Sequence, residues 1–247
     1  MNDPEAVVLA LDAGNTRIKW GVHDGVSWSV RGAVATGEAA RLYESLRPAL
    51  PVEAAIACNV AGAAVRSQLE EACRQAGIAL RMIGSVREQL GVKNAYRDPA
   101  QLGADRWAAL IAAHHGHRGD KLVVNVGTAL TIDALTATGQ FLGGLIVPGP
   151  ALMRRSLDQG TAALREAPGA VLDFPDATAE AIASGAVHAC VGAISRMGAA
   201  MAARGTPPGR IILSGGAAGE IEKWLPYPAT FQENLVLDGL LAIARND

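Results

Sequence analysis

The sequence predicts an α/β protein of two similar halves, residues 1–118 and 119–247, that meet at a central cleft. Short apolar runs typical of buried strands alternate along the chain with longer segments of helical periodicity. Each half also opens alike, with an apolar strand and a turn containing glycine and threonine, LALDAGNT in the first half and VVNVGTALT in the second. Such a repeat favours a duplicated unit. A single open sheet with helices on both faces is the alternative.

The first half is expected to contain four strand regions and three helices. In order, they are a strand over 6–11, a strand meander over 16–36 with turns at 23–25 and 31–32, a helix near 38–50, a strand over 54–60, a helix over 62–76, a strand over 79–83, an irregular segment over 84–103 and a helix over 104–115. The helix over 62–76 places Val65, Leu69 and Cys73 on one face, the spacing of an amphipathic helix.

The second half restarts the pattern at Lys121, where KLVVNVG predicts a buried strand. The expected elements that follow are further strands over 128–149 with a turn at 138–139, helices near 150–164 and 177–203, a strand over 210–216, a short helix over 217–225 and a last helix over 235–245.

Composition excludes several classes of function. The chain has 247 residues, 19% of them charged, and a formal net charge of −2, so no basic stripe for nucleic acid is expected. The N-terminus, MNDPEA, is acidic where a signal sequence would be basic, so no signal sequence is expected. Residues 181–203 are apolar, but they contain His188 and Arg196 among many alanines and glycines, which predicts a packed helix rather than a membrane span. Three widely spaced cysteines indicate a cytoplasmic location without disulfides or a zinc site.

The turn after the first strand predicts a phosphate site. Asp12 ends an apolar strand and is followed by Ala13, Gly14, Asn15 and Thr16. Gly14 would allow a positive φ and the close approach of a ligand, successive backbone N–H groups would face phosphate oxygens, and the Asp12 carboxylate would suit hydrated Mg²⁺. An ordinary hairpin turn is the other interpretation.

Two features of the second half favour the phosphate interpretation. Residues 125–129, Asn-Val-Gly-Thr-Ala, repeat the device, and LSGGAAG at 213–219 ends a strand in paired glycines where an adenosine could lie against bare backbone. Together the three segments resemble the ATP site of the actin, hexokinase and Hsp70-like kinase superfamily. This resemblance implies ribonuclease H-like (actin-like ATPase) halves and a nucleotide, but no substrate.

Asp105 is the candidate catalytic residue. It falls in the first turn of the helix over 104–115, where the helix dipole favours a charged carboxylate. Arg106 beside it is suited to an anionic substrate group. A helix-capping role for Asp105 is the alternative.

A family resemblance indicates which substrate the protein phosphorylates. Gly-Ala-Asp-Arg at 103–106 with Tyr96 upstream, GGLIVPG at 143–149 and TAEAIASG at 178–185 resemble the type III pantothenate kinases over nearly the whole chain. The resemblance implies ATP-dependent phosphorylation of pantothenate at the start of coenzyme A synthesis, with Mg²⁺, a monovalent cation (K⁺ or NH₄⁺) and a homodimer.

The same resemblance assigns roles to residues. Asp105 would be the base. The residues lining the ATP phosphates would be Asp12, Ala13, Gly14, Asn15, Thr16, Arg17, Ile18, Lys19 and Thr128. Those facing pantothenate would be Tyr96, Gly103, Ala104, Asp105 and Arg106, together with Thr178 from the neighbouring subunit.

Two positions depart from the family pattern. Asn125 stands where the family usually has the aspartate of its monovalent-cation site, which puts that site in doubt, and Arg165 replaces a typical proline.

Two alternative functions remain. One is a regulatory ATP-binding module, as in chains named Bvg accessory factor, and the other is another small-molecule kinase such as a sugar kinase. Asp12, Asp105 and Arg106 favour catalysis. The sequence leaves open a Mg²⁺ or capping role for Asp133, and the histidines at 114, 115 and 117 are expected at a helix end rather than on a metal.

Overall fold

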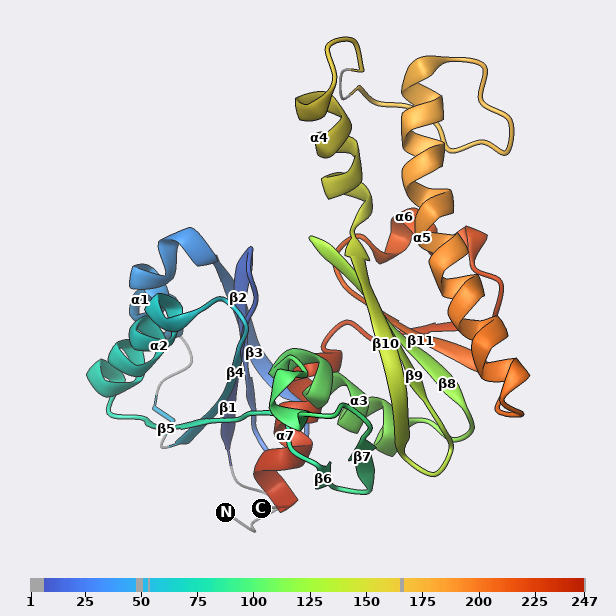
Figure 1. The fold of residues 1–247 in the computed structure, drawn as a ribbon. Coiled ribbons are helices and arrows are strands. Elements are labelled where there is room, and N and C mark those ends of the chain that lie inside the picture. Colours follow the sequence, from blue (N-terminus) through green and yellow to red (C-terminus); the bar gives the residue numbers. More distant parts are fainter. Residues whose placement is uncertain (1–6, 48–50, 53, 165–166, 247) are drawn as a thin grey trace. The chain divides into compact units, whose positions relative to one another are not determined.

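The structure, a computed structural model, describes residues 7–47, 51–52, 54–164 and 167–246. The chain forms two compact units (Figure 1), residues 1–117 with 234–247 and residues 118–233. The C-terminal helix therefore belongs to the first unit, although the sequence had placed it in the second half. Arg165 and the end of the helix expected near 38–50 lie outside the described residues.

The first unit contains a mixed five-stranded sheet with the order β3-β2-β1-β4-β5. Its strands are β1 (Val8–Ala13), β2 (Arg17–His23), β3 (Trp28–Ala35), β4 (Ala54–Asn59) and β5 (Ala79–Met82). The first three run antiparallel, and β4 and β5 add in parallel. Both faces of β1 are buried, which explains why its sequence is a continuous apolar run.

Helices cover both faces of this sheet (Figure 1). The 3-10 helix Thr36–Arg41, α1 (Leu42–Leu46) and α2 (Ala63–Ala76) pack one core, in which Leu42 and Leu69 are fully buried. On the other face α3 (Ala104–Gly116) packs against α7 (Leu235–Asn246), and α7 contacts β1 and β4. A Cβ at Gly239 would collide with the backbone of Ala108, so the two helices approach closely only because residue 239 is glycine.

One predicted turn is wrong. The chain was expected to turn at residues 31–32, but β3 runs straight through them and pairs with β2. Gly32 lies opposite Trp20, whose indole occupies the space where a Cβ would be. This glycine therefore makes room for an aromatic ring within the sheet instead of forming a turn.

The segment expected to be irregular, 84–103, contains a small hairpin. Strands β6 (Glu88–Gln89) and β7 (Val92–Asn94) pair antiparallel, and a 3-10 helix follows at Pro99–Gln101. Leu90 at its turn has a φ of 50°, an uncommon conformation for a leucine.

In the second unit the strands lie in the order β12-β11-β8-β9-β10. They are β8 (Lys121–Val126), β9 (Ala129–Leu135), β10 (Gln140–Pro148), β11 (Arg210–Ser214) and β12 (Ala229–Phe231). β12 was not predicted. The helices are α4 (Pro150–Gly160), α5 (Thr178–Ala203), α6 (Ala218–Ile221) and the 3-10 helix Glu222–Trp224.

Helix α5 is long enough and apolar enough to cross a membrane by length and composition alone. Its best 18-residue window has a mean hydropathy of 1.2, and a third of that window is buried within the chain. A single helix of this kind is weak evidence, because core helices meet the same criterion. Val187, Cys190 and Ile194 of α5 pack in the core of the second unit.

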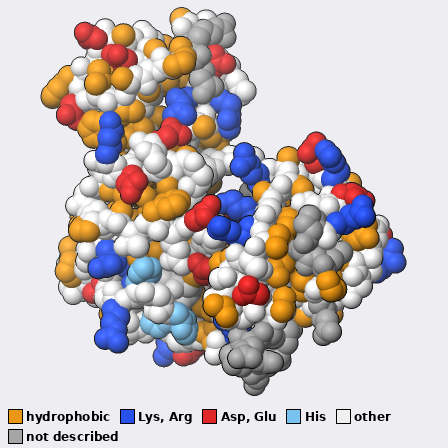
Figure 2. Space-filling view, turned by 180° about the vertical axis from the view of Figure 1, so that it is seen from behind, with side chains coloured by type: hydrophobic (Ala, Val, Ile, Leu, Met, Phe, Trp, Pro, Cys, Tyr) orange, Lys and Arg blue, Asp and Glu red, His pale blue; other side chains and the backbone are white. Residues whose placement is uncertain are grey.

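On the face drawn in Figure 2, acidic and basic side chains are interspersed.

Candidate active site

The turn between β1 and β2 presents the first group of predicted ATP residues. Asp12 pairs with Lys19 and Ala13 with Ile18 across the two strands, while Asn15, Thr16 and Arg17 are exposed at the tip. The Gly14 N–H donates to Arg17 O (3.1 Å), and the Thr36 hydroxyl donates to Gly14 O (2.7 Å). The turn is therefore held at its base and open to solvent at its tip.

Of the two expected reasons for glycine at position 14, the positive φ is wrong, while the close approach of a ligand stays a prediction. Gly14 is not among the glycines with positive φ in the described residues. A Cβ there would stand 3.3 Å from Arg17 O. The absence of a side chain thus matters for the tight closure of the turn rather than for a left-handed backbone.

Asp12 lies beside a thiol and a second carboxylate. Cys58 is its register partner on the parallel strand β4, and the Cys58 thiol donates to Asp12 Oδ1 at 3.4 Å. Burial and the nearby charge of Asp105 raise the pKa of Asp12 to about 6, against the opposing effects of Cys58 and Lys19. A buried carboxylate with a second carboxylate nearby is a setting that a divalent cation stabilises.

Asp105 is held at the start of α3. Gly103 caps the helix, and Asp105 Oδ1 accepts a hydrogen bond from the Arg106 N–H at 2.8 Å. A Cβ at Gly103 would come within 2.6 Å of that oxygen, so glycine leaves room for the carboxylate. Burial raises the pKa of Asp105, although the Arg106 N–H and guanidinium lower it. The side chain is a positioned carboxylate with a proton affinity above the usual one.

Arg106 joins Asp105 to Tyr96. It is only 6% exposed, and its Nη1 donates to the Tyr96 hydroxyl at 3.1 Å while its guanidinium lies 5.8 Å from the ring centre. Tyr96, Asp105 and Arg106, predicted as substrate residues, are thus brought together within the first unit. They adjoin Asp12, the first of the predicted ATP residues.

The second unit brings its own predicted residues together. The Gly127 N–H donates to Ala129 O (3.0 Å), and the Gly149 N–H donates to Thr128 O (2.9 Å). Asn125 Oδ1 and Val126 O both border Gly215, which has a φ of 100°. The ends of β8, β10 and β11 therefore converge, and Thr128 is exposed there. The oxygens beside Gly215 form a neutral donor set, which fits a monovalent cation weakly.

Thr178 and Asp133 lie elsewhere in the second unit. Thr178 is the exposed first residue of α5, so its role beside pantothenate stays a prediction. Asp133 is 1% exposed in the middle of β9, opposite Val123. In the first unit, His115 Nε2 lies 3.0 Å from Leu90 O, and no group of three potential metal-binding side chains occurs among the described residues.

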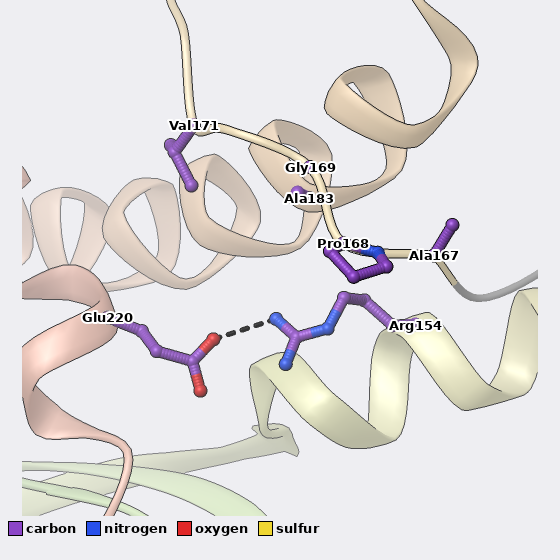
Figure 3. A pocket seen from close by; sticks show the side chains of 7 residues that line it. All are labelled: Arg154, Ala167, Pro168, Gly169, Val171, Ala183 and Glu220. Carbon is purple, nitrogen blue, oxygen red and sulfur yellow. Dashed lines mark hydrogen bonds and ion pairs between the residues drawn. The ribbon is translucent and has the colours of Figure 1, made fainter.

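A pocket of the second unit is lined by none of these predicted residues. Figure 3 shows Arg154 of α4 and Glu220 of α6 pointing toward each other in it, and their ion pair measures 2.7 Å. The other lining residues are Ala167, Pro168, Gly169, Val171 and Ala183. The internal ion pair neutralises the charged side chains of the pocket, so it offers little to a charged ligand.

Sequence reasoning missed Cys58 and Thr36. Cys58 lies near the end of a strand parallel to β1, and polar residues at the ends of adjacent parallel strands meet at one edge. That rule could have indicated Cys58. Nothing local indicated Thr36, whose contact with Gly14 depends on how β3 returns along β2.

The fold matches those of solved proteins over nearly the whole chain. A glucomannokinase from Arthrobacter sp. strain KM, described as using inorganic polyphosphate or ATP, matches with a TM-score of 0.50 and 16% identity, covering 98% of this chain and all of that one. A structure from Campylobacter jejuni described as a candidate Baf family transcriptional activator has a TM-score of 0.63 and 18% identity, covering 96% and 97% of the two chains. At these identities the likeness shows the fold alone, and it confirms the predicted α/β class.

The family follows from sequence. The model of the type III pantothenate kinases matches residues 8–200. Type III pantothenate kinases of Nitrosospira multiformis and Aromatoleum aromaticum are each 46% identical to the chain, over 97% and 98% of its length and 91% and 99% of theirs. The chain belongs to the type III pantothenate kinase family.

Proposed function

We propose that the protein transfers the γ-phosphoryl group of ATP to the primary hydroxyl of pantothenate, giving 4'-phosphopantothenate in the first step of coenzyme A biosynthesis. Family membership supports this activity. The observation that carries it is the placement of Asp105 at the start of α3, close to Asp12 and next to Arg106, which is hydrogen-bonded to Tyr96. This proximity supports Asp105 as the base, near the proposed phosphate turn and the proposed anion-binding arginine.

Asp105 orients the attacking hydroxyl and accepts its proton. Phosphoryl transfer depends mainly on positioning and charge neutralisation, so little proton transfer is needed early in the step. The raised pKa of Asp105 makes the carboxylate a better proton acceptor than a free aspartate. Arg106 holds the pantothenate carboxylate, with Tyr96, Gly103 and Ala104 beside it.

The turn from Asp12 to Lys19 lines the ATP phosphates, with Thr128 alongside. Its exposed tip offers backbone N–H groups and the side chains of Asn15, Thr16 and Arg17. Asp12 is the residue that would hold Mg²⁺, and the bound ion would neutralise charge on the transferring phosphoryl group. Its raised pKa and its neighbour Asp105 support this assignment.

The remaining proposals concern the monovalent cation and the assembly. Asn125 would contribute one neutral oxygen to a K⁺ or NH₄⁺ site, weaker than one built on a carboxylate. The protein is a cytoplasmic homodimer in which Thr178 reaches the pantothenate site of the neighbouring subunit. The exposed position of Thr178 at the start of α5 is compatible with such a contact.

A coupled assay of ADP release tests the proposal. Pantothenate would be compared with a panel of sugars, each with and without K⁺ or NH₄⁺. We expect ADP release with pantothenate as the acceptor and none with any of the sugars. ATP binding without turnover of any acceptor would instead favour the regulatory module, and turnover of a sugar would favour another small-molecule kinase.

A further inference from the structure

We infer that Arg87 is a positioning residue for substrate binding, because its guanidinium fixes the backbone of the segment 94–97 that carries Tyr96. The inference rests on the proposed function, in which Tyr96 faces pantothenate. Arg87 itself is exposed and directly precedes β6. It was not among the residues that the sequence indicated for the site.

The guanidinium of Arg87 binds three carbonyl groups of this segment. Nη1 donates to Asn94 O (2.8 Å) and to Tyr96 O (2.7 Å), and Nη2 donates to Arg97 O (3.0 Å). The Asn94 N–H in turn donates to Arg87 O at 2.9 Å. A planar, permanently charged fork suits several carbonyls at once, and charge-assisted hydrogen bonds are stronger than neutral ones.

Asn94 holds the same segment from its other side. Its side chain is buried, and Oδ1 accepts a hydrogen bond from the Tyr96 N–H at 3.0 Å. Its Nδ2 donates to Ser85 Oγ (2.9 Å) and Pro99 O (3.2 Å). The backbone of Tyr96 is therefore fixed at its N–H by Asn94 and at its carbonyl by Arg87.

These anchors replace secondary structure. Residues 95–98 belong to no helix or strand, so ladder hydrogen bonds do not order them. The Tyr96 hydroxyl nevertheless meets Arg106 Nη1 at 3.1 Å. Without the Arg87 fork, the segment would have to be ordered when substrate binds, and that cost would appear as weaker binding of the substrate that Tyr96 faces.

The test compares Arg87→Met with Arg66→Met in the full-length enzyme. Arg66 is an exposed arginine of the same unit whose guanidinium pairs with Glu70 on its own helix, so its substitution controls for loss of a surface charge. We expect Arg87→Met to raise the KM for pantothenate about 10-fold and to leave the KM for ATP within about 2-fold. Hydrogen exchange should rise at the backbone N–H groups of residues 94–98, 100 and 101 and remain unchanged in α2.

Several outcomes decide the inference. An unchanged KM for pantothenate in a folded Arg87→Met variant overturns it, as does a rise in exchange spread over the whole unit. If Arg87→Met does not fold, Arg87→Lys takes its place, because an ammonium keeps the charge but cannot span three carbonyls. If Arg87→Lys then has the wild-type KM for pantothenate and wild-type hydrogen exchange, the positioning role of Arg87 is rejected. If the wild type does not phosphorylate pantothenate, the proposed function fails, while the exchange measurement still tells whether Arg87 orders the segment.

Discussion

The carboxylate of Asp105, at the start of α3, helps to raise the pKa of Asp12, at the end of β1, to about 6. Burial is the larger cause, and the Cys58 thiol and Lys19 act in the opposite direction. The two residues are 93 positions apart in the sequence, one in the predicted phosphate turn and the other in the predicted substrate helix. Their proximity ties these two parts of the site together and leads to the first two predictions.

Replacing Asp105 by asparagine should abolish most turnover. Asparagine keeps the shape of the side chain but cannot accept the hydroxyl proton, so we expect kcat to fall by about 10² to 10⁴. ATP binding should remain, because the proposed ATP site lies on the turns at residues 12–19 and 125–129 rather than on α3. Steady-state kinetics and calorimetry with ATP check both parts. Asp24→Asn, in an exposed turn of the same unit, is the control, and retained activity in the Asp105 variant would reject the assignment.

Asp12→Asn should stabilise the unliganded protein at neutral pH. The pKa of Asp12 is about 6 in the folded protein against an ordinary value of 3.8, so the folded state resists ionisation of this carboxyl. The loss of folding free energy caused by ionising Asp12 is absent below about pH 4 and grows as the pH rises through 6, to at most about 3 kcal/mol. Denaturant titrations at pH 4 and pH 8 measure it. Asp24, whose pKa is lowered by the N–H groups of Ser27 and Val26, should show the opposite sign when changed to asparagine.

Asp12→Ala should also separate the two substrates. Its carboxylate lies at the strand end before the phosphate turn, so Mg²⁺-dependent use of ATP should weaken while pantothenate binding stays nearly unchanged. Calorimetry with each substrate distinguishes these effects. A fall in pantothenate affinity with unchanged use of ATP would show that Asp12 acts on pantothenate and would contradict its assignment to the ATP phosphates.

Asn125→Asp should sharpen the dependence on K⁺ or NH₄⁺. In the wild type, Asn125 Oδ1 and Val126 O beside Gly215 carry no formal charge, and the amide NH₂ could contact a phosphate directly. We therefore expect the wild type to need more cation than its family or to depend on it less. Rates are to be measured against K⁺ at constant ionic strength, because salt alone screens surface charge. Superimposable curves for the two proteins would show that residue 125 does not tune the cation site.

Lys121→Met should raise the free energy of unfolding by about 1–3 kcal/mol at pH 7. The Lys121 side chain is fully buried, and its Nζ has no hydrogen-bond partner among the described residues. Burial lowers its pKa, so the gain should shrink as the pH rises toward 10.5, where the unfolded lysine also loses its proton. Chemical denaturation at pH 7 and pH 10 tests this, with Lys223→Met as a control at a lysine over the Trp224 ring. No gain at pH 7 would contradict the prediction.

The sequence by itself determined the α/β class, most helices and strands, and the residue types of both glycine turns. These features depend on local patterns, because alternating burial and turn chemistry are written in consecutive residues. The motifs from Asp12 to Lys19 and from Gly103 to Arg106 likewise carried the family resemblance without any knowledge of distant contacts. Where one local rule competed with packing, at Gly32, the rule failed, because a glycine that suits a turn also suits the space beside an indole.

Only the tertiary structure decided which distant residues meet. The pairing of Cys58 with Asp12 depends on β4 adding in parallel beside β1, and α7 joins the first unit because its glycine permits close packing on α3. The pKa values of Asp12 and Asp105 follow from burial and neighbouring charge, which no local pattern contains. The Arg87 fork has the same origin, since the carbonyl groups that it binds are brought within reach only when the chain reverses between β6 and β7.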